Sequence, residues 1–235
     1  MVTCMVFSRR SKAWFAKVAI AALAVALVAS GVVVANPASA AKNKAVASFF
    51  SSKEVRSKNM KPFKKWTAAV KRYSAEKGKA KKSTGTCESK KFNKCHYEKW
   101  IKFLVGIKKK DKLTQIKAVN TFMNKSRYIT DQNNWGKKDF WASPGEFMAR
   151  FGDCEDFAIA KFMSLRLLGF KNTEIRVVAV KDLNLKVGHA ILVAFVDGET
   201  YVLDNQIKQV IAADRVRHYQ PVFSINTKYW WRHNT

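Results

Sequence analysis

Three side chains of this 235-residue chain have the types and the order needed for acyl transfer through a covalent intermediate. Cys154 begins a long apolar run, which predicts that its sulfur lies in the first turn of a buried helix. His189 starts one run of strand-forming residues, and Asp204 ends the next. A nucleophile, a base and a carboxylate that orients the base are the groups such catalysis requires. Taken alone, Cys154 is also consistent with an inert core thiol, and His189 with a satisfied strand histidine.

The hairpin that carries the last two residues can be given a register from its turn. Asp197-Gly198 is typical of a two-residue turn, and the numbers of facing residues then sum to 395. His189 faces Gln206, and Asp204 faces Ile191. His189 and Asp204 therefore share one face of the sheet as diagonal neighbours, about 7–8 Å apart by backbone. A change of one residue in the loop would place them on opposite faces.

The segment before and after Cys154 carries the signals of two successive helices. Ser143-Pro144 followed by Glu146 is typical of a capped helix start, and Gly152 ends that helix. Asp153 then starts a second helix, and Gly169 ends it. The second helix is apolar nearly all round, so we expect it at the centre of the fold.

Three acids surround the candidate nucleophile. Free amides at a helix start lower the pKa of a thiol, but Asp153, Glu155 and Asp156 add negative charge beside Cys154 and oppose this effect. A histidinium or a bound cation must offset them.

The first forty residues have the form of an export signal. Arg9, Arg10, Lys12 and Lys17 precede an apolar stretch over residues 18–34, and Pro37-Ala38-Ser39-Ala40 fits a cleavage site after Ala40. The alternative is a retained membrane anchor. Either form predicts that the rest of the chain works in an oxidising compartment.

Cysteine pairing follows from export. Cys4 leaves with the signal, and we expect Cys87 and Cys95 to form a short-range disulfide, which leaves Cys154 as a thiol. Metal binding by Cys87, Cys95 and His96 is an alternative that lacks a nearby fourth ligand.

The net charge of +27 is concentrated in the front half, where residues 42–112 hold 23 basic and 5 acidic residues. We therefore divide the chain into a signal peptide (1–40), a lysine-rich helical segment with a linker (41–86) and a main domain (87–235). The linker is expected over residues 77–85. The basic segment suits contact with anionic lipid or cell-wall polymer, or it is simply a solvated charged face. An exported chain without an aromatic-rich RNA motif is not expected to bind nucleic acid.

Several blocks of sequence resemble one family. The blocks are Trp135-Gly136, Asp139-Phe140-Trp141-Ala142-Ser143-Pro144, Gly152-Asp153-Cys154-Glu155-Asp156, His189-Ala190, Val202-Leu203-Asp204-Asn205 and Pro221-Val222-Phe223-Ser224-Ile225-Asn226. Over roughly residues 87–231 the chain is similar to the bacterial transglutaminase-like cysteine proteinases, which include the LapG-type periplasmic proteases. An upstream cysteine pair is also seen in this group.

The resemblance implies an α+β, papain/transglutaminase-like fold, with N-terminal helices and a central cysteine-bearing helix packed on an antiparallel sheet. It implies Cys154 as nucleophile, His189 as base and Asp204 as orienter. It also implies a calcium ion held through Asp153 and Glu155, with Asp156 as a weaker candidate. Hard carboxylate oxygens suit that ion.

The resemblance further implies a periplasmic cysteine endopeptidase. LapG-type members cut large surface adhesins at a di-alanine site, which releases biofilm cells, and an inner-membrane receptor that senses cyclic di-GMP sequesters them. The oxyanion donors expected here are the Cys154 N–H and a second group, for which Trp135 and Gln132 are candidates. Two alternatives stay open: transglutaminase-type acyl transfer by the same triad, and a non-catalytic exported binding module with a basic tether.

Overall fold

The computed structural model describes residues 49–234. The signal peptide, its cleavage site and Cys4 lie outside the described residues. Within residues 49–234 no helix is long and apolar enough to cross a membrane.

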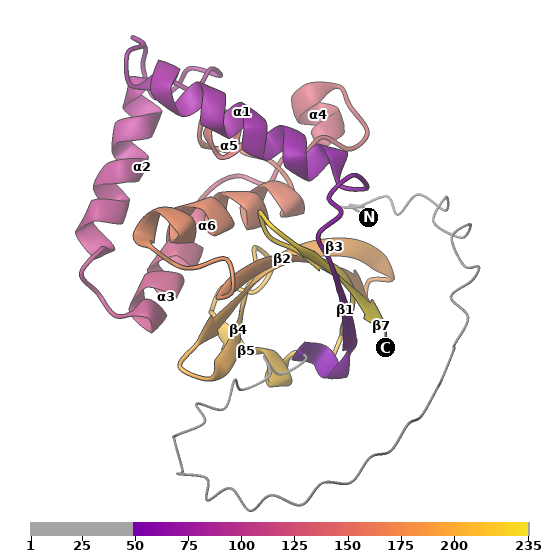
Figure 1. Ribbon diagram of the computed structural model, residues 1–235. Helices are drawn as coiled ribbons and strands as arrows, with labels where there is room; N and C mark the ends of the chain where they lie inside the picture. Colours follow the sequence, from indigo (N-terminus) through magenta and orange to yellow (C-terminus); the bar gives the residue numbers. More distant parts are fainter. Residues whose placement is uncertain (1–48, 235) are drawn as a thin grey trace, which may run out of the picture. The chain divides into compact units, whose positions relative to one another are not determined.

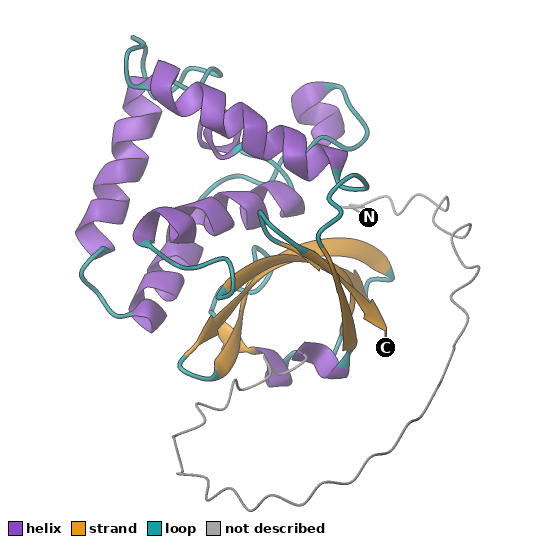
Figure 2. Ribbon diagram, in the orientation of Figure 1, coloured by secondary structure: helices purple, strands orange, loops and turns teal. Residues whose placement is uncertain are grey.

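A seven-stranded antiparallel sheet forms one half of the fold, and it is strongly curved (Figure 2). The strands are β1 (Lys53–Ser57), β2 (Ile175–Asp182), β3 (Val187–Val196), β4 (Glu199–Leu203), β5 (Ile211–Ala212), β6 (Tyr219–Ile225) and β7 (Trp230–Asn234). Their order in the sheet is β1-β7-β6-β2-β3-β4-β5, so strands from both ends of the described chain meet at one edge.

Six helices lie together beside the sheet (Figure 1). They are α1 (Lys64–Ala80), α2 (Lys94–Ile107), α3 (Lys112–Met123), α4 (Asp131–Trp135), α5 (Pro144–Arg150) and α6 (Cys154–Leu168). Two short 3₁₀ turns, η2 (Phe49–Ser51) and η3 (Ala213–Arg215), complete the described elements. The predicted α+β class, with N-terminal helices and an antiparallel sheet, is confirmed.

Helix α6 is the centre of the core. It packs against β2 and β3 on one side and against α2, α3 and α5 on the others. Every residue from Cys154 to Leu165 is buried, as a sequence that is apolar nearly all round predicts. The helix ends at Gly169, which adopts a left-handed conformation as the sequence predicts.

The hairpin register is confirmed. Leu192 pairs with Leu203 and Val196 with Glu199, so the numbers of facing residues sum to 395. Asp197 and Gly198 both have positive φ, at 51° and 85°, which is what a two-residue turn of the I′ kind requires. The register therefore brings the start of β3 and the residues after β4 to the same face of the sheet.

The described part of the lysine-rich segment, residues 49–86, belongs to the same compact unit as the main domain. Strand β1 pairs with β7, and α1 packs against α2 and α5. Helix α1 runs to Ala80, which is buried, so the polar linker expected from residue 77 is wrong for its first four residues. The helix continues there because Ala80 packs into the fold.

The disulfide between Cys87 and Cys95 is confirmed, with a Cα–Cα distance of 5.3 Å. It joins the loop after α1 to the first turn of α2. The nearby ring of His96 is engaged on both sides: Nδ1 lies 3.0 Å from Asn93 Oδ1, and Nε2 lies 2.9 Å from the Cys87 carbonyl. These bonds use both ring nitrogens, which argues against the alternative of a metal site at this cysteine pair.

Candidate active site

The turn between α5 and α6 sets the position of Cys154. The Ser143 hydroxyl accepts from the Glu146 N–H at 3.1 Å, and the Glu146 carboxylate accepts from the Ser143 N–H at 2.6 Å. This capping box starts α5 where the sequence predicts. Asp153 is the N-cap residue of α6, so Cys154 occupies the first helical position and is fully buried.

Gly152 is required at this turn by a close approach of Asp156. A Cβ atom at Gly152 would lie 2.0 Å from Asp156 Oδ2. The same carboxylate accepts from the Ala142 N–H at 2.6 Å and from the Asp153 N–H at 3.3 Å. Asp156 therefore ties the start of α6 to the segment that precedes α5.

The structure brings His189 and Asp204 together. His189 Nε2 lies 2.9 Å from Asp204 Oδ1, and both side chains are buried. The predicted diagonal pair is thus a direct contact. Because Nε2 is engaged by the carboxylate, Nδ1 is the ring nitrogen left for chemistry. The Gln206 amide lies 3.4 Å from Nδ1, as expected for the residue that faces His189 in the register.

Asp204 is held as a carboxylate by three donors. Tyr219 donates its hydroxyl to Oδ2 at 2.7 Å, and the Gln206 N–H donates to Oδ1 at 2.9 Å, beside the His189 bond. Burial raises the pKa of Asp204, but these hydrogen bonds and the charge of His189 outweigh it and hold that pKa below its ordinary value. The carboxylate is therefore fixed in place and suited to orient the imidazole.

Cys154 lies on α6, which packs directly on the strand that carries His189 (Figure 1). Its Sγ lies 3.2 Å from Glu155 Oε2. Among residues 49–234 no cysteine is free, since Cys154 is disulfide-bonded as well as Cys87 and Cys95. The thiol at Cys154 is expected for the chain without residues 1–40, and that expectation stays a prediction. The approach of this sulfur to the imidazole stays a prediction.

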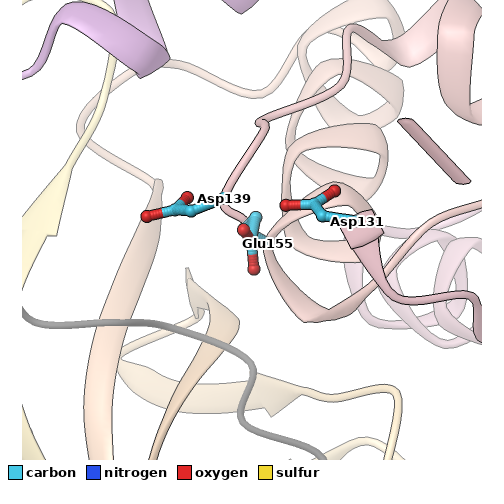
Figure 3. A group of neighbouring side chains, drawn as sticks. All are labelled: Asp131, Asp139 and Glu155. Carbon is cyan, nitrogen blue, oxygen red and sulfur yellow. The ribbon is translucent and has the colours of Figure 1, made fainter. Parts of the chain in front are cut away.

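Glu155 is one of five acidic residues that lie close together where α6 begins. Ligand oxygens of Asp131, Asp139 and Glu155 lie within 4.8 Å of one another, and so do those of Asp131, Asp153 and Asp156. Figure 3 shows the first group, with Glu155 between the two aspartates. The two groups share Asp131, so they form one acidic cluster, and we use that name for these five residues.

The family follows from a comparison over most of the described chain. Residues 80–232 match the sequence model described as bacterial transglutaminase-like cysteine proteinase BTLCP. This chain belongs to that family. The resemblance of the motif blocks is thereby confirmed.

Solved structures agree with this assignment. The chain is similar to Legionella pneumophila LapG, with 28% identity and a TM-score of 0.57 over 68% of this chain and 87% of that one. Structures described as calcium-bound and as EGTA-treated LapG match with 28% identity, at TM-scores of 0.57 and 0.58. They cover 67% and 69% of this chain and 86% of each matched chain. No curated protein matches the chain.

Four members of the acidic cluster of this family member, Asp131, Asp153, Glu155 and Asp156, have a raised pKa. Burial raises the pKa of Asp131 to about 6 and that of Asp153 to about 7. Burial and then the neighbouring acids raise the pKa of Glu155 and Asp156 well above the ordinary range. So many carboxyl groups at one buried place cost free energy unless protons or a cation neutralise them.

The donor set fits a hard divalent cation. Asp131 Oδ1, Asp139 Oδ1 and Asp153 Oδ1 are buried and have no hydrogen-bond partner among the described residues. Buried carboxylate oxygens without a donor are rare, and calcium takes six to eight such oxygens in flexible geometry. Asp153 and Glu155, the ligands that the resemblance implied, both belong to the cluster.

Sequence reasoning missed Asp131, Asp139 and Tyr219. Asp139 stands in one of the motif blocks, but nothing in its spacing from Cys154 shows that the two meet. Tyr219 comes from β6, which does not neighbour the hairpin in sequence. Of the two candidates for the second oxyanion donor, Gln132 is exposed, whereas Trp135 Nε1 is buried without a partner among the described residues. The role of Trp135 stays a prediction.

Proposed function

We propose that this chain is an exported cysteine protease that hydrolyses a peptide bond through a thioester on Cys154. The observation that carries the proposal is the buried His189–Asp204 pair, with its Nε2–Oδ1 distance of 2.9 Å, on the strand against which α6 packs. Family membership supplies the reaction class. Export and a periplasmic location rest on the sequence of residues 1–40.

The nucleophile belongs to the processed chain. Cleavage after Ala40 removes Cys4 and leaves an odd number of cysteines, of which Cys87 and Cys95 are bridged. We expect Cys154 to carry the thiol in that form. Its place at the start of α6 exposes it to the helix dipole, which favours the thiolate.

The reaction follows from the roles of these side chains. The thiolate attacks the carbonyl carbon, and the C–N bond of the tetrahedral intermediate breaks as His189 Nδ1 gives a proton to the leaving amine. The same nitrogen then takes a proton from water, whose oxygen attacks the thioester and releases the acid and the thiolate. Asp204 keeps the Nε2 proton in place throughout. The Cys154 N–H, and by hypothesis Trp135 Nε1, donate to the oxyanion.

The acidic cluster would hold calcium through Asp131, Asp139, Asp153, Glu155 and Asp156. When bound, calcium supplies positive charge that offsets the acids beside Cys154. This proposal is supported by the donor set and by the calcium-bound structure of LapG from Legionella pneumophila, described above.

The substrate we propose is a large surface adhesin cut at a di-alanine site, which makes the protease a regulator of biofilm release. A cyclic di-GMP-sensing receptor of the inner membrane is the proposed regulatory partner. The basic residues of α1 and α2 are available to contact anionic lipid or cell-wall polymer.

A cleavage assay tests the function. The chain 41–235 is incubated with an adhesin fragment that contains an Ala-Ala pair, and products are identified by mass spectrometry. Cys154→Ala should abolish cleavage while the melting temperature stays close to that of wild type. Persistent cleavage by Cys154→Ala would refute the role of this sulfur. Products that gain an added amine instead of water would identify a transglutaminase. Mass spectrometry of the alkylated chain should find one thiol, at Cys154.

A further inference from the structure

Helix α1 presents a stripe of three charged side chains to the segment over residues 139–146. Lys65, Arg72 and Glu76 are separated by seven and four positions, which places them on one face of the helix. Each contacts a different part of that segment. The segment leads from α4 to α5 and so supports the turn into α6.

The contacts of Arg72 are the most extensive. Its Nε lies 3.0 and 3.1 Å from the two carboxylate oxygens of Glu146, and its terminal nitrogen donates to the Trp141 carbonyl. Its guanidinium also lies over the ring of Phe140, 4.6 Å from the centroid. One side chain thus fixes three points of the segment, in a partly buried setting where charge-assisted bonds are strong.

The other two members of the stripe contact the segment on either side of the Arg72 contacts at Phe140 and Trp141. Glu76 accepts from the Ser143 hydroxyl and, at 3.1 Å, from the Gly145 N–H. Lys65 forms an ion pair with Asp139, which is itself a member of the acidic cluster.

The backbone of the same segment also contacts two other members of the acidic cluster. The Phe140 N–H donates to Asp131 Oδ2, and the Ala142 N–H donates to Asp156 Oδ1 at 2.6 Å. The segment therefore contacts both α1 and two carboxylates of the cluster, whose orientation it helps to set. Displacing Phe140 would free Asp131 from one donor, and displacing Ala142 would free Asp156 from another.

We propose that α1 is a positioning element for the acidic cluster, and that its Arg72 and Glu76 determine how tightly the cluster binds calcium. The family match begins at residue 80, where α1 ends, so these side chains lie outside the matched segment. The inference rests on the proposed calcium site for its second half only. Mutation of residues that support the ligands of a metal site commonly weakens metal affinity 10–100-fold.

Arg72→Met in the chain 41–235 tests this, with Lys71→Met as the control. Lys71 is exposed, lies on the same helix and loses the same charge. Amide exchange of Phe140 and Ala142 is followed in EGTA, and calcium affinity is measured by calorimetry. Arg72→Met should speed exchange at both amides about tenfold, the equivalent of one charge-assisted hydrogen bond, and weaken calcium binding by about tenfold or more. Lys71→Met should change neither.

Two substitutions of Glu76, one that keeps the acceptor and one that removes it, give a second test. Glu76→Gln keeps an acceptor for Ser143 and Gly145 and should bind calcium like wild type, whereas Glu76→Ala should resemble Arg72→Met. Similar exchange and affinity in Arg72→Met and Lys71→Met would overturn the proposal, as would equal affinity in the two Glu76 variants. A wild type that binds no calcium would refute the calcium part of the proposed function, and the exchange rates would then decide alone whether α1 positions the segment.

Discussion

Calcium should stabilise the folded chain much more at pH 8 than at pH 5. The acidic cluster binds calcium only as carboxylates. Burial raises the pKa of Asp131, Asp153, Glu155 and Asp156, so these four groups hold their protons to unusually high pH. The pKa of Asp131 is about 6 and that of Asp153 about 7. At pH 5 protons therefore compete with the cation, and at pH 8 they do not.

The size of the effect can be worked out for a fixed calcium concentration. At 100 times the dissociation constant, a ligand adds ~2.7 kcal/mol to the free energy of unfolding. For a domain of this size ~1 kcal/mol shifts the melting temperature by ~2–4 °C, so we expect a rise of ~5–11 °C at pH 8. At pH 5, protonation of Asp153 two units below its pKa weakens binding ~100-fold. The remaining ~0.4 kcal/mol corresponds to ~1–2 °C.

In the calcium-free chain, the free energy of unfolding changes with pH in the opposite direction to that produced by an ordinary salt bridge. Carboxyl groups with raised pKa keep protons in the folded state that the unfolded chain releases, so the free energy of unfolding falls as pH rises from ~4 to ~7. Stability contributed by these protons is complete below the unfolded pKa and is lost as pH passes the folded pKa.

Calorimetric melting of the chain 41–235 in EGTA and in calcium, at pH 5 and pH 8, measures both effects. Asp153→Asn should reduce the difference between the two pH values. Asp111→Asn, an exposed N-cap substitution that preserves the cap of α3, serves as control. Equal calcium shifts at the two pH values, or no shift at pH 8, would refute the reasoning from buried carboxylates.

Three substitutions test other parts of the site. Tyr219→Phe removes one donor to Asp204 and should lower the free energy of unfolding by about 1–3 kcal/mol in urea titrations. Its cleavage rate should fall less than that of Asp204→Asn, for which we expect a loss of about 10⁴-fold. Gly152→Ala forces a methyl group against Asp156 and should cost about 1–3 kcal/mol by the same titration; an unchanged midpoint would contradict the close approach. Burial lowers the pKa of Lys161 to about 7, so wild-type stability should rise from pH 7 to pH 10, where the unfolded chain still binds a proton that the folded chain has released. Lys161→Met should remove that rise in urea titrations at the two pH values.

Local chemistry explains what could be predicted from sequence. The turn at Asp197 and Gly198 fixes a register by itself, and the register determines that His189 and Asp204 share a face. The cap at Ser143 likewise depends only on residues within one turn. Such features need no knowledge of the rest of the fold.

Tertiary packing explains which features could not be predicted from the sequence. Asp131 reaches Asp153 because α4 folds back beside the start of α6, and Tyr219 reaches Asp204 because β6 returns to the sheet next to β2. The lysines of α1 look like a solvated face in sequence, and most of them are. Only the structure shows that Lys65 meets an acid of the cluster.

The acidic cluster and the nucleophile impose opposite demands on the first turn of α6. Negative charge at a helix start is favourable to the helix, which accounts for acids at Asp153, Glu155 and Asp156, but charge so close to Cys154 disfavours a thiolate. Protonation of Asp153 below about pH 7 would ease the conflict, but an ordinary thiol is itself mostly protonated there. A bound cation removes it at higher pH and keeps the carboxylates in place. Calcium binding and thiolate formation at Cys154 should therefore be thermodynamically linked, since each lowers the free energy of the other.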